Sequence, residues 1–227
     1  MQHLLLLHGA IGSKDQLQPL ANVLQENFII HTIDFSGHGG SAIPEAPFSI
    51  DLFATQALEY LDQNNVAEVN IFGYSMGGYV ALYLAKHHPN KLKKIITLGT
   101  KFYWDETIAA KEIKMLDPEI IQQKIPAFAT QLKERHAPAD WKGVLKKTRD
   151  LLEGLGNNSP LKSRHFLDIL IPCLLLLGDR DKMITLEETI AVHKQLPNAQ
   201  LGILPATPHP IEQMDIGLLA FFIKRFL

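Results

Sequence analysis

The sequence predicts an α/β fold, with a mainly parallel sheet of about six strands and helices on both of its faces. Two observations support this prediction: six short apolar runs recur along the chain, and segments with helical periodicity separate them. The runs are mostly continuous rather than alternating, which is typical of parallel strands buried on both faces. The expected strands span residues 2–7, 28–34, 69–72, 94–98, 173–177 and 200–204.

Three of the intervening helices have recognisable N-termini. Ser13 and Thr185 each stand three residues before a Gln or Glu, which is the spacing of a capping box, and Ser49 precedes apolar residues at helical spacing. Residues 214–227 are rich in Leu and Phe, with only two basic residues near the end. We therefore expect a helix packed on the sheet there, rather than one lying on a membrane surface.

Between residues 100 and 170 the alternation of strand and helix stops. The segment has the pattern of several helices separated by turns that contain Pro or Gly. We therefore expect a single domain, residues 1–227, in which a helical insertion at 101–168 separates the core parts 1–100 and 169–227.

One motif stands at a predicted strand-to-helix junction. The apolar run that ends at Phe72 leads into Gly73-Tyr74-Ser75-Met76-Gly77, and a helical pattern follows at once. In this context Gly-x-Ser-x-Gly is typical of a nucleophile elbow, a tight turn that lifts the serine hydroxyl above the sheet edge. Glycines leave room for such a turn. The first amides of the new helix, Met76 foremost, would then point toward an oxygen bound beside Ser75.

Acidic residues and a histidine follow later strands. The expected strand at 173–177 is followed by Gly178-Asp179-Arg180-Asp181, and the strand at 200–204 is followed by a loop that contains His209. A serine hydroxyl needs a base whose pKa lies near 7, and a base histidine needs a carboxylate to hold its tautomer. His209 is the candidate base. Position in the sequence leaves both Asp179 and Asp181 open as its carboxylate.

Two more motifs lie at strand ends: His8-Gly9-Ala10 after the first strand and Asp34-Phe35-Ser36-Gly37-His38-Gly39 after the second. With these motifs and the order Ser, Asp, His, the chain resembles the α/β-hydrolase superfamily over residues 2–98 and 171–227. The resemblance implies that Asp181, which completes a Gly-x-x-Asp pattern, is the acid. It also implies that Ala10 supplies a second oxyanion amide beside that of Met76.

The resemblance further implies that the insertion is a lid over Ser75. Because the antiparallel hairpin that opens many relatives is not seen before the first strand, it implies an all-parallel sheet. Phe102, Tyr103 and Trp104 directly follow the strand at 94–98. Aromatic side chains at this position are expected to wall the pocket against the acyl or leaving group, although such residues more often only pack a lid on its core.

The leading functional hypothesis is a serine hydrolase that cleaves an ester or thioester of a small, largely apolar acyl compound through an acyl-enzyme. A carbon–carbon bond hydrolase or lyase-like enzyme with the same triad is the alternative. A non-catalytic small-molecule binding protein is a third hypothesis, and the presence of Ser75, Asp181 and His209 argues against it.

Composition excludes several classes of partner. The formal net charge is −2 and no Lys/Arg run occurs, so neither nucleic acid nor another polyanion is expected. Cys173 lies in an apolar strand, where a buried spectator thiol is expected. His3, His8, His31 and His38 lack metal-motif spacing, so no metal or other cofactor is expected. Without a visible signal peptide or membrane span, a cytoplasmic enzyme acting on a small molecule is predicted.

Overall fold

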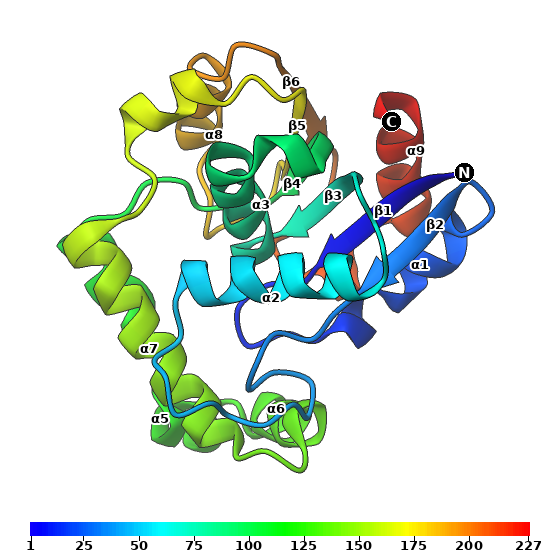
Figure 1. The fold of residues 1–227 in the computed structure, drawn as a ribbon. Coiled ribbons are helices and arrows are strands. Elements are labelled where there is room, and N and C mark those ends of the chain that lie inside the picture. The colour runs from blue at the N-terminus through cyan, green and yellow to red at the C-terminus, as the bar shows by residue number, and fades with distance from the viewer.

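The computed structural model describes all 227 residues, which form a six-stranded sheet (Figure 1). Its strand order is β2-β1-β3-β4-β5-β6, and every neighbouring pair is parallel. This confirms the predicted fold class. The strands are β1 (Gln2–Leu7), β2 (Phe28–Thr32), β3 (Val69–Tyr74), β4 (Leu92–Leu98), β5 (Cys173–Gly178) and β6 (Ala199–Leu204).

The predicted strands differ from the observed ones only at their ends. β3 continues to Tyr74 because Gly73 and Tyr74 pair with the last residues of β4. β4 begins earlier than predicted because Leu92 already pairs with Val69. β2 stops at Thr32, where its pairing with β1 stops, because it lies at the sheet edge and has no second neighbour.

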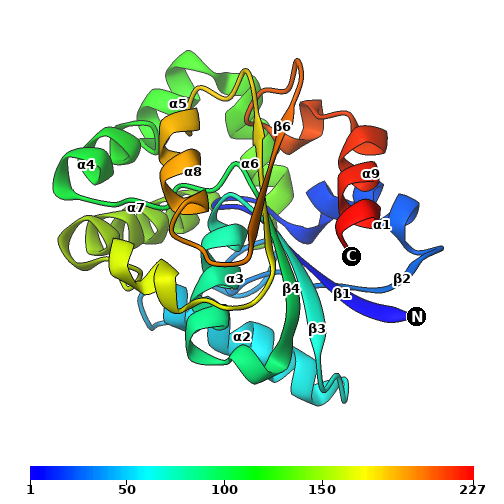
Figure 2. The ribbon, with the colours of Figure 1, turned by 90° about the horizontal axis from the view of Figure 1, so that it is seen from above.

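Helices cover both faces of the sheet (Figure 2). α1 (Gln18–Leu24) and α9 (Ile216–Phe226) pack on one face, and α2 (Ile50–Gln63), α3 (Met76–His87) and α8 (Leu186–His193) pack on the other. Successive residues of a strand therefore enter different cores. In β1, Leu5 and Leu7 belong to the core under α2 and α3, whereas Leu4 and Leu6 belong to the core under α1 and α9. Burial on both faces explains why the strands lack alternation.

The predicted helix starts are confirmed. The Ser49 hydroxyl accepts a hydrogen bond from the Leu52 amide at 3.0 Å and so caps α2. Thr185 caps α8 in the same way. Ser13 opens the short helix η1 (Lys14–Leu17), which leads into α1, and its own amide donates to the Gln16 side chain. The other short helices are η2 (Pro89–Lys91), η3 (Ser163–Asp168) and η4 (Ile211–Gln213).

Four helices are inserted between β4 and β5: α4 (Glu106–Lys114), α5 (Pro118–Lys124), α6 (Pro126–His136) and α7 (Trp141–Asn158). Figure 1 shows α5, α6 and α7 beyond the end of the sheet toward which the strands point. α5, α6 and α7 share a small core of their own, formed by Ile121, Ala129, Leu132, Trp141 and Leu145. The inserted helices thus stand over the carboxyl ends of the strands.

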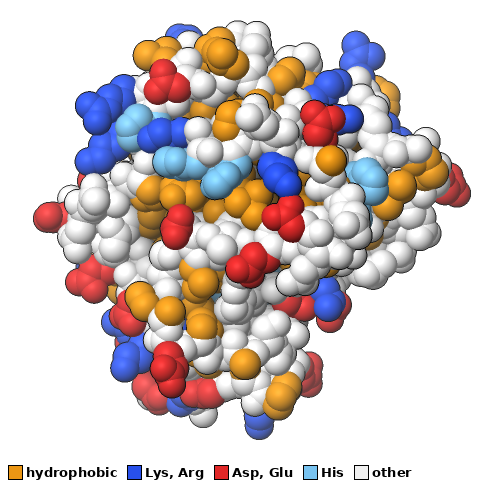
Figure 3. All heavy atoms as spheres, in the orientation of Figure 1, with side chains coloured by type: hydrophobic (Ala, Val, Ile, Leu, Met, Phe, Trp, Pro, Cys, Tyr) orange, Lys and Arg blue, Asp and Glu red, His pale blue; other side chains and the backbone are white.

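The C-terminal helix α9 packs against α1 and the sheet, as predicted. No helix of the chain is long and apolar enough to cross a membrane. Acidic and basic side chains are interspersed over the face seen in Figure 3, and histidines gather there with basic residues. Burial, and then the charge of Lys86, lower the pKa of both His87 and His165.

The strand order reverses between β1 and β3, because β2 lies beyond β1 while β4, β5 and β6 follow β3 on the other side. In open α/β sheets, ligands bind at such a switch point, just outside the carboxyl ends of the strands. Here Leu7 at the end of β1 pairs with Gly73 of β3. The loops that carry Ala10 and Ser75 therefore start side by side.

Candidate active site

Ser75 stands alone in the turn between β3 and α3, with φ 52° and ψ −115°. A positive φ is strained for a residue with a Cβ, and such strain is typical of functional sites. The turn is held from β4: the Ser75 amide donates to the Leu98 carbonyl at 2.8 Å, and the Thr100 hydroxyl donates to the Ser75 carbonyl at 3.0 Å. The backbone thus fixes where the serine hydroxyl lies.

The two glycines of the motif have no room for a side chain. A Cβ at Gly73 would collide with the backbone of Gly77 and Gly78, and one at Gly77 would collide with the carbonyl of Leu7. Both approaches are backbone to backbone, so no rotamer change could relieve them. The structure therefore accounts for both glycines of the Gly-x-Ser-x-Gly motif.

His209 and Asp181 meet at the ends of β6 and β5. The His209 Nδ1 lies 2.7 Å from Asp181 Oδ2, and the carboxylate is 1% exposed. A carboxylate only accepts hydrogen bonds, so Nδ1 carries the proton and Nε2 is left as an acceptor. Gly99 makes room for the pair, because a Cβ there would lie 3.2 Å from Asp181 and 3.3 Å from His209.

The other oxygen of Asp181 accepts hydrogen bonds from the amides of Met183 at 2.8 Å and Ile184 at 2.9 Å. Burial alone would raise the pKa of Asp181, but the hydrogen bond and charge of His209 and these two amides together lower it. The carboxylate therefore stays ionised beside the imidazole.

Asp179 has a different position. Its Oδ1 accepts a hydrogen bond from the Thr207 amide at 3.0 Å, and the amides of Ala206 and Thr207 lower its pKa. The Tyr74 hydroxyl donates to the His209 carbonyl at 3.1 Å. Asp179 and Tyr74 therefore hold the loop that carries His209, and of the two aspartates only Asp181 is hydrogen-bonded to its imidazole.

Ala10 and Met76 line the same cavity as Ser75. Met76 is the first residue of α3, where helix amides have no intrahelical acceptor. The Ala10 amide has no acceptor within the protein. Both donors are thus available to a bound oxygen.

The loop after Ala10 is held by the insertion. Ile11 has a φ of 51°, and its carbonyl accepts hydrogen bonds from Arg135 Nη1 and His136 Nε2, each at 3.1 Å. The Gly39 amide donates to His136 Nδ1 at 3.3 Å, so His136 is neutral with its proton on Nε2. Sequence analysis missed Arg135 and His136, because nothing in the pattern of α6 shows which loop it contacts.

A cavity of about 830 Å³ contains Ser75 and His209 in its wall. The insertion supplies much of the rest, including Leu151, Leu152 and Leu155 of α7. Of the three predicted wall residues, only Trp104 lines this cavity. Phe102 is 1% exposed and packs edge-on against Phe166, and the Tyr103 hydroxyl accepts a hydrogen bond from Gln195. Both of these rings lie between β4, η3 and α8, away from the cavity.

The remaining nucleophilic and metal-binding side chains are placed elsewhere. Cys173 is buried in β5, and burial raises the pKa of its thiol to about 12. No three His, Cys, Asp or Glu side chains are grouped so that they could hold a metal ion. Ser75 and His209, by contrast, both line the cavity.

Comparison with known proteins gives the family. Residues 2–152 match the family described as alpha/beta hydrolase fold. The chain is 26% identical over 225 residues to the pimeloyl-(acyl-carrier protein) methyl ester esterase of Neisseria meningitidis strain FAM18, spanning 90% of this chain and 85% of that protein. It is 26% identical over 245 residues to a Bacillus subtilis (strain 168) protein provisionally named 2-succinyl-6-hydroxy-2,4-cyclohexadiene-1-carboxylate synthase, spanning 97% and 88%.

Among solved structures, MenH from S. aureus superposes with a TM-score of 0.80 at 22% identity, over all of this chain and 93% of that one. The enol-lactonase from Burkholderia xenovorans LB400 superposes with a TM-score of 0.79 at 16% identity, over 99% and 90%. These likenesses show the fold. Together with the family match over two thirds of the sequence, they place the chain in the α/β-hydrolase fold family, as an esterase-like enzyme.

Proposed function

We propose that the protein is a serine hydrolase that cleaves an ester or thioester of a small, largely apolar acyl compound, with Ser75, His209 and Asp181 as its catalytic triad. The observation that carries this proposal is the hydrogen bond of 2.7 Å between Asp181 and His209 in the wall of the cavity that contains Ser75. No hydrogen bond joins Ser75 to His209 in this conformation. Such bonds are often long in ligand-free enzymes and tighten in the substrate complex.

In the proposed mechanism, His209 Nε2 takes the proton of the Ser75 hydroxyl as the oxygen attacks the acyl carbon. The Asp181 carboxylate stabilises the imidazolium, and the amides of Ala10 and Met76 stabilise the oxyanion. The proton then passes from His209 to the leaving alcohol or thiol, which leaves an acyl group on Ser75. Water, activated by His209, releases the acid and restores the serine.

We further propose that the insertion at residues 101–168 is the lid of this site. It supplies Trp104, Leu116, Phe128 and the three leucines of α7 to the cavity wall. Burying an apolar side-chain-sized group contributes about 2 kcal/mol, so a wall of this kind favours apolar acyl groups. Among the relatives, the esterase from Neisseria meningitidis is named for a methyl ester.

A carbon–carbon bond hydrolase or lyase-like enzyme is the second candidate. It is supported by the name of the Bacillus subtilis relative, a carboxylate synthase. The same serine and histidine could serve such a step, because His209 can move a proton without an acyl-enzyme being formed. Activity alone separates the two candidates.

The test is a panel of short-chain aryl esters and acyl thioesters with wild-type protein and Ser75→Ala. We expect turnover by the wild type, its near-complete loss in Ser75→Ala, and labelling of the wild type by a fluorophosphonate at Ser75 alone. A small residual rate above that of the uncatalysed reaction in water is usual when one triad member is lost. Ester turnover that stays at roughly a tenth of wild type or more in Ser75→Ala would refute the assignment.

Ser41, a half-buried serine outside the cavity, provides the matched control: Ser41→Ala should keep both turnover and labelling. If the wild type turns over no ester or thioester but releases acid from a β-diketone, the carbon–carbon candidate replaces the first.

A further inference from the structure

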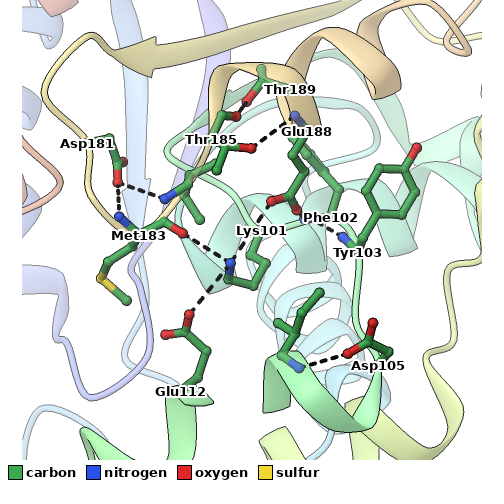
Figure 4. A network of polar contacts seen from close by, with 12 residues as sticks. Lys101, Phe102, Tyr103, Asp105, Glu112, Asp181, Met183, Thr185, Glu188 and Thr189 are labelled. Atoms are coloured by element: carbon green, nitrogen blue, oxygen red, sulfur yellow. Dashed lines mark hydrogen bonds and ion pairs between the residues drawn. The ribbon is translucent and has the colours of Figure 1, made fainter. Parts of the chain in front are cut away.

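Two pairs of opposite charges line the cavity: the Arg135–Glu212 ion pair, and a second pair in the wall where the core meets the insertion. Lys101, just past the end of β4, and Glu112, on α4 of the insertion, both line the cavity. Figure 4 shows the Lys101 ammonium between Glu112, Glu188 of α8 and the Met183 carbonyl. The wall is formed jointly by the core and the insertion.

The hydrogen-bonding capacity of Lys101 is only partly used. Its Nζ donates to the Met183 carbonyl at 3.1 Å. The carboxylates of Glu112 and Glu188 lie at 3.6 Å and 4.0 Å, whereas a charge-assisted hydrogen bond is about 2.8 Å long. An ammonium has three donors, so Lys101 keeps two for another acceptor, although its side chain is only 14% exposed.

Glu112 is less satisfied still. Its side chain is 7% exposed and accepts no hydrogen bond from the protein. Glu188 differs, because its Oε1 accepts from the amides of Phe102 at 2.6 Å and Tyr103 at 3.0 Å. Its only charged partner is therefore the Lys101 ammonium, at a distance longer than a hydrogen bond. A ligand group that donates to Glu112 and accepts from Lys101 would use the free hydrogen-bonding capacity of both side chains.

We propose that this wall binds a hydroxyl group carried by the apolar chain of the substrate, so that the enzyme prefers hydroxylated substrates over unsubstituted ones. A hydroxyl can accept from Lys101 and donate to Glu112 at the same time. A carboxylate on the substrate could accept from Lys101 but would face the charges of both Glu112 and Glu188. An ammonium would face Lys101. A neutral group that both donates and accepts therefore fits the wall best.

This inference rests on the proposed ester hydrolysis and names its substrate class. The hydroxyl could be carried by the acyl group or by the alcohol, and two series of esters distinguish these sources. One series places a hydroxyl at successive carbons of a hexanoyl group, and the other places it on the alcohol. Each is compared with its unsubstituted parent and with the corresponding carboxylate-bearing ester.

We expect the wild type to have a kcat/KM at least about tenfold higher for a hydroxylated ester, at one or two positions of one series, than for its parent. In the double variant Lys101→Met/Glu112→Leu, which removes both charges together, this ratio should fall to about one. Glu112→Gln, which is nearly isosteric, should keep part of it because an amide oxygen still accepts from the hydroxyl. This single variant keeps the test decisive if the double variant does not fold.

Glu119→Gln is the matched control, since Glu119 also lies on the insertion and pairs with a lysine, Lys142, but does not line the cavity. It should leave the ratio unchanged. A wild-type ratio near one at every position in both series, a ratio that survives the double variant, or a preference for the carboxylate-bearing esters would overturn the inference. Failure of the wild type on all esters, parents included, would instead count against the proposed function.

Discussion

At the residue scale, two aspartates two positions apart hold different parts of the site. Asp181 contacts the imidazole of His209, whereas Asp179 accepts the Thr207 amide in the loop that leads to His209. The difference arises at the end of β5. The Asp179 amide still donates to the Leu204 carbonyl of β6, whereas the Asp181 amide donates back to the Gly178 carbonyl in a turn. Their substitutions should therefore have different consequences.

We expect Asp181→Asn to lower kcat by several orders of magnitude, on the order of 10⁴-fold as for the corresponding change in a serine protease, because an amide can hold His209 in the wrong tautomer. Asp179→Asn should have a minor effect, since its amide oxygen still accepts the Thr207 hydrogen bond. Steady-state kinetics of both variants, with folding checked by circular dichroism, tests the ranking. Equal losses in the two variants would show that Asp181 has no special role.

The three aromatic residues after β4, Phe102, Tyr103 and Trp104, also have different positions. Trp104 lines the cavity, but Phe102 is buried against Phe166. Trp104→Ala should change the preference for acyl length in kcat/KM. Phe102→Ala should instead lower the free energy of unfolding by about 3–5 kcal/mol, as is usual for a buried Phe, with little change in preference. Urea unfolding together with an acyl-length series would decide, and a length preference that shifts only in Phe102→Ala would contradict this division.

At the element scale, the C-terminal end of α6 fastens the insertion to the loop after β1. Arg135 and His136 both donate to the Ile11 carbonyl, one residue beyond the proposed oxyanion amide of Ala10. Nearby, His8 donates to the Gly9 carbonyl and accepts from the Phe35 amide. Two neutral histidines thus hold this loop, one from the core and one from the insertion.

Both histidines make stability depend on pH. Burial, with the Arg135 charge adding to it for His136, lowers the pKa of His8 and of His136 from 6.5 to about 4. The unfolded chain therefore binds more protons between pH 6.5 and 4. The contribution of the two histidines to the free energy of unfolding is fully present above about pH 6.5. It falls as the pH drops toward 4, by about 1.4 kcal/mol per pH unit for each histidine in this range.

We expect His136→Gln to make this slope shallower by about one proton, because glutamine keeps a donor for Ile11 and an acceptor for Gly39 but does not titrate. Urea unfolding at pH 4.5 to 7.5 measures the slope in both proteins. His193→Gln, on α8 and away from this junction, is the control and should leave the slope unchanged. An identical pH dependence in wild type and His136→Gln would contradict a neutral, buried His136.

At the scale of the whole molecule, the sheet and the insertion contribute opposite walls of one cavity. The sheet presents Ser75 and His209 at its carboxyl edge. Helices α4 to α7 stand over that edge, and α5, α6 and α7 share a small core of their own. This small core contains fewer buried residues than either of the two cores beside the sheet. The insertion should therefore open locally at lower free energy than the sheet.

Hydrogen exchange tests this division of the molecule. We expect amides of β3 and β4 to exchange most slowly and those of α4 and α5 to exchange faster. A phosphonate bearing a hexyl chain, attached to Ser75, should slow exchange in α4 to α7 and leave α9, on the opposite face of the sheet, unchanged. The same reagent with Ser75→Ala is the control. No protection in α4 to α7 would argue against a lid.

Much of the fold could be predicted from the sequence because its signals are local. Continuous apolar runs marked the buried parallel strands, and Ser49 and Thr185 marked helix starts through hydrogen bonds made within one turn. The glycines around Ser75 are needed for contacts made within the elbow itself and with the adjacent β1. These features depend on residues close in the chain or on neighbouring strands, so their pattern is visible without the structure.

The α/β architecture, the serine turn and the order of serine, acid and histidine at strand ends could therefore be predicted without the structure. Three features could not: which aspartate contacts His209, that Trp104 rather than Phe102 or Tyr103 faces the cavity, and that Arg135 and His136 hold the loop after Ala10. These contacts join segments that are distant in the chain. Their partners are set by how the inserted helices pack over the sheet, and no local periodicity encodes that packing.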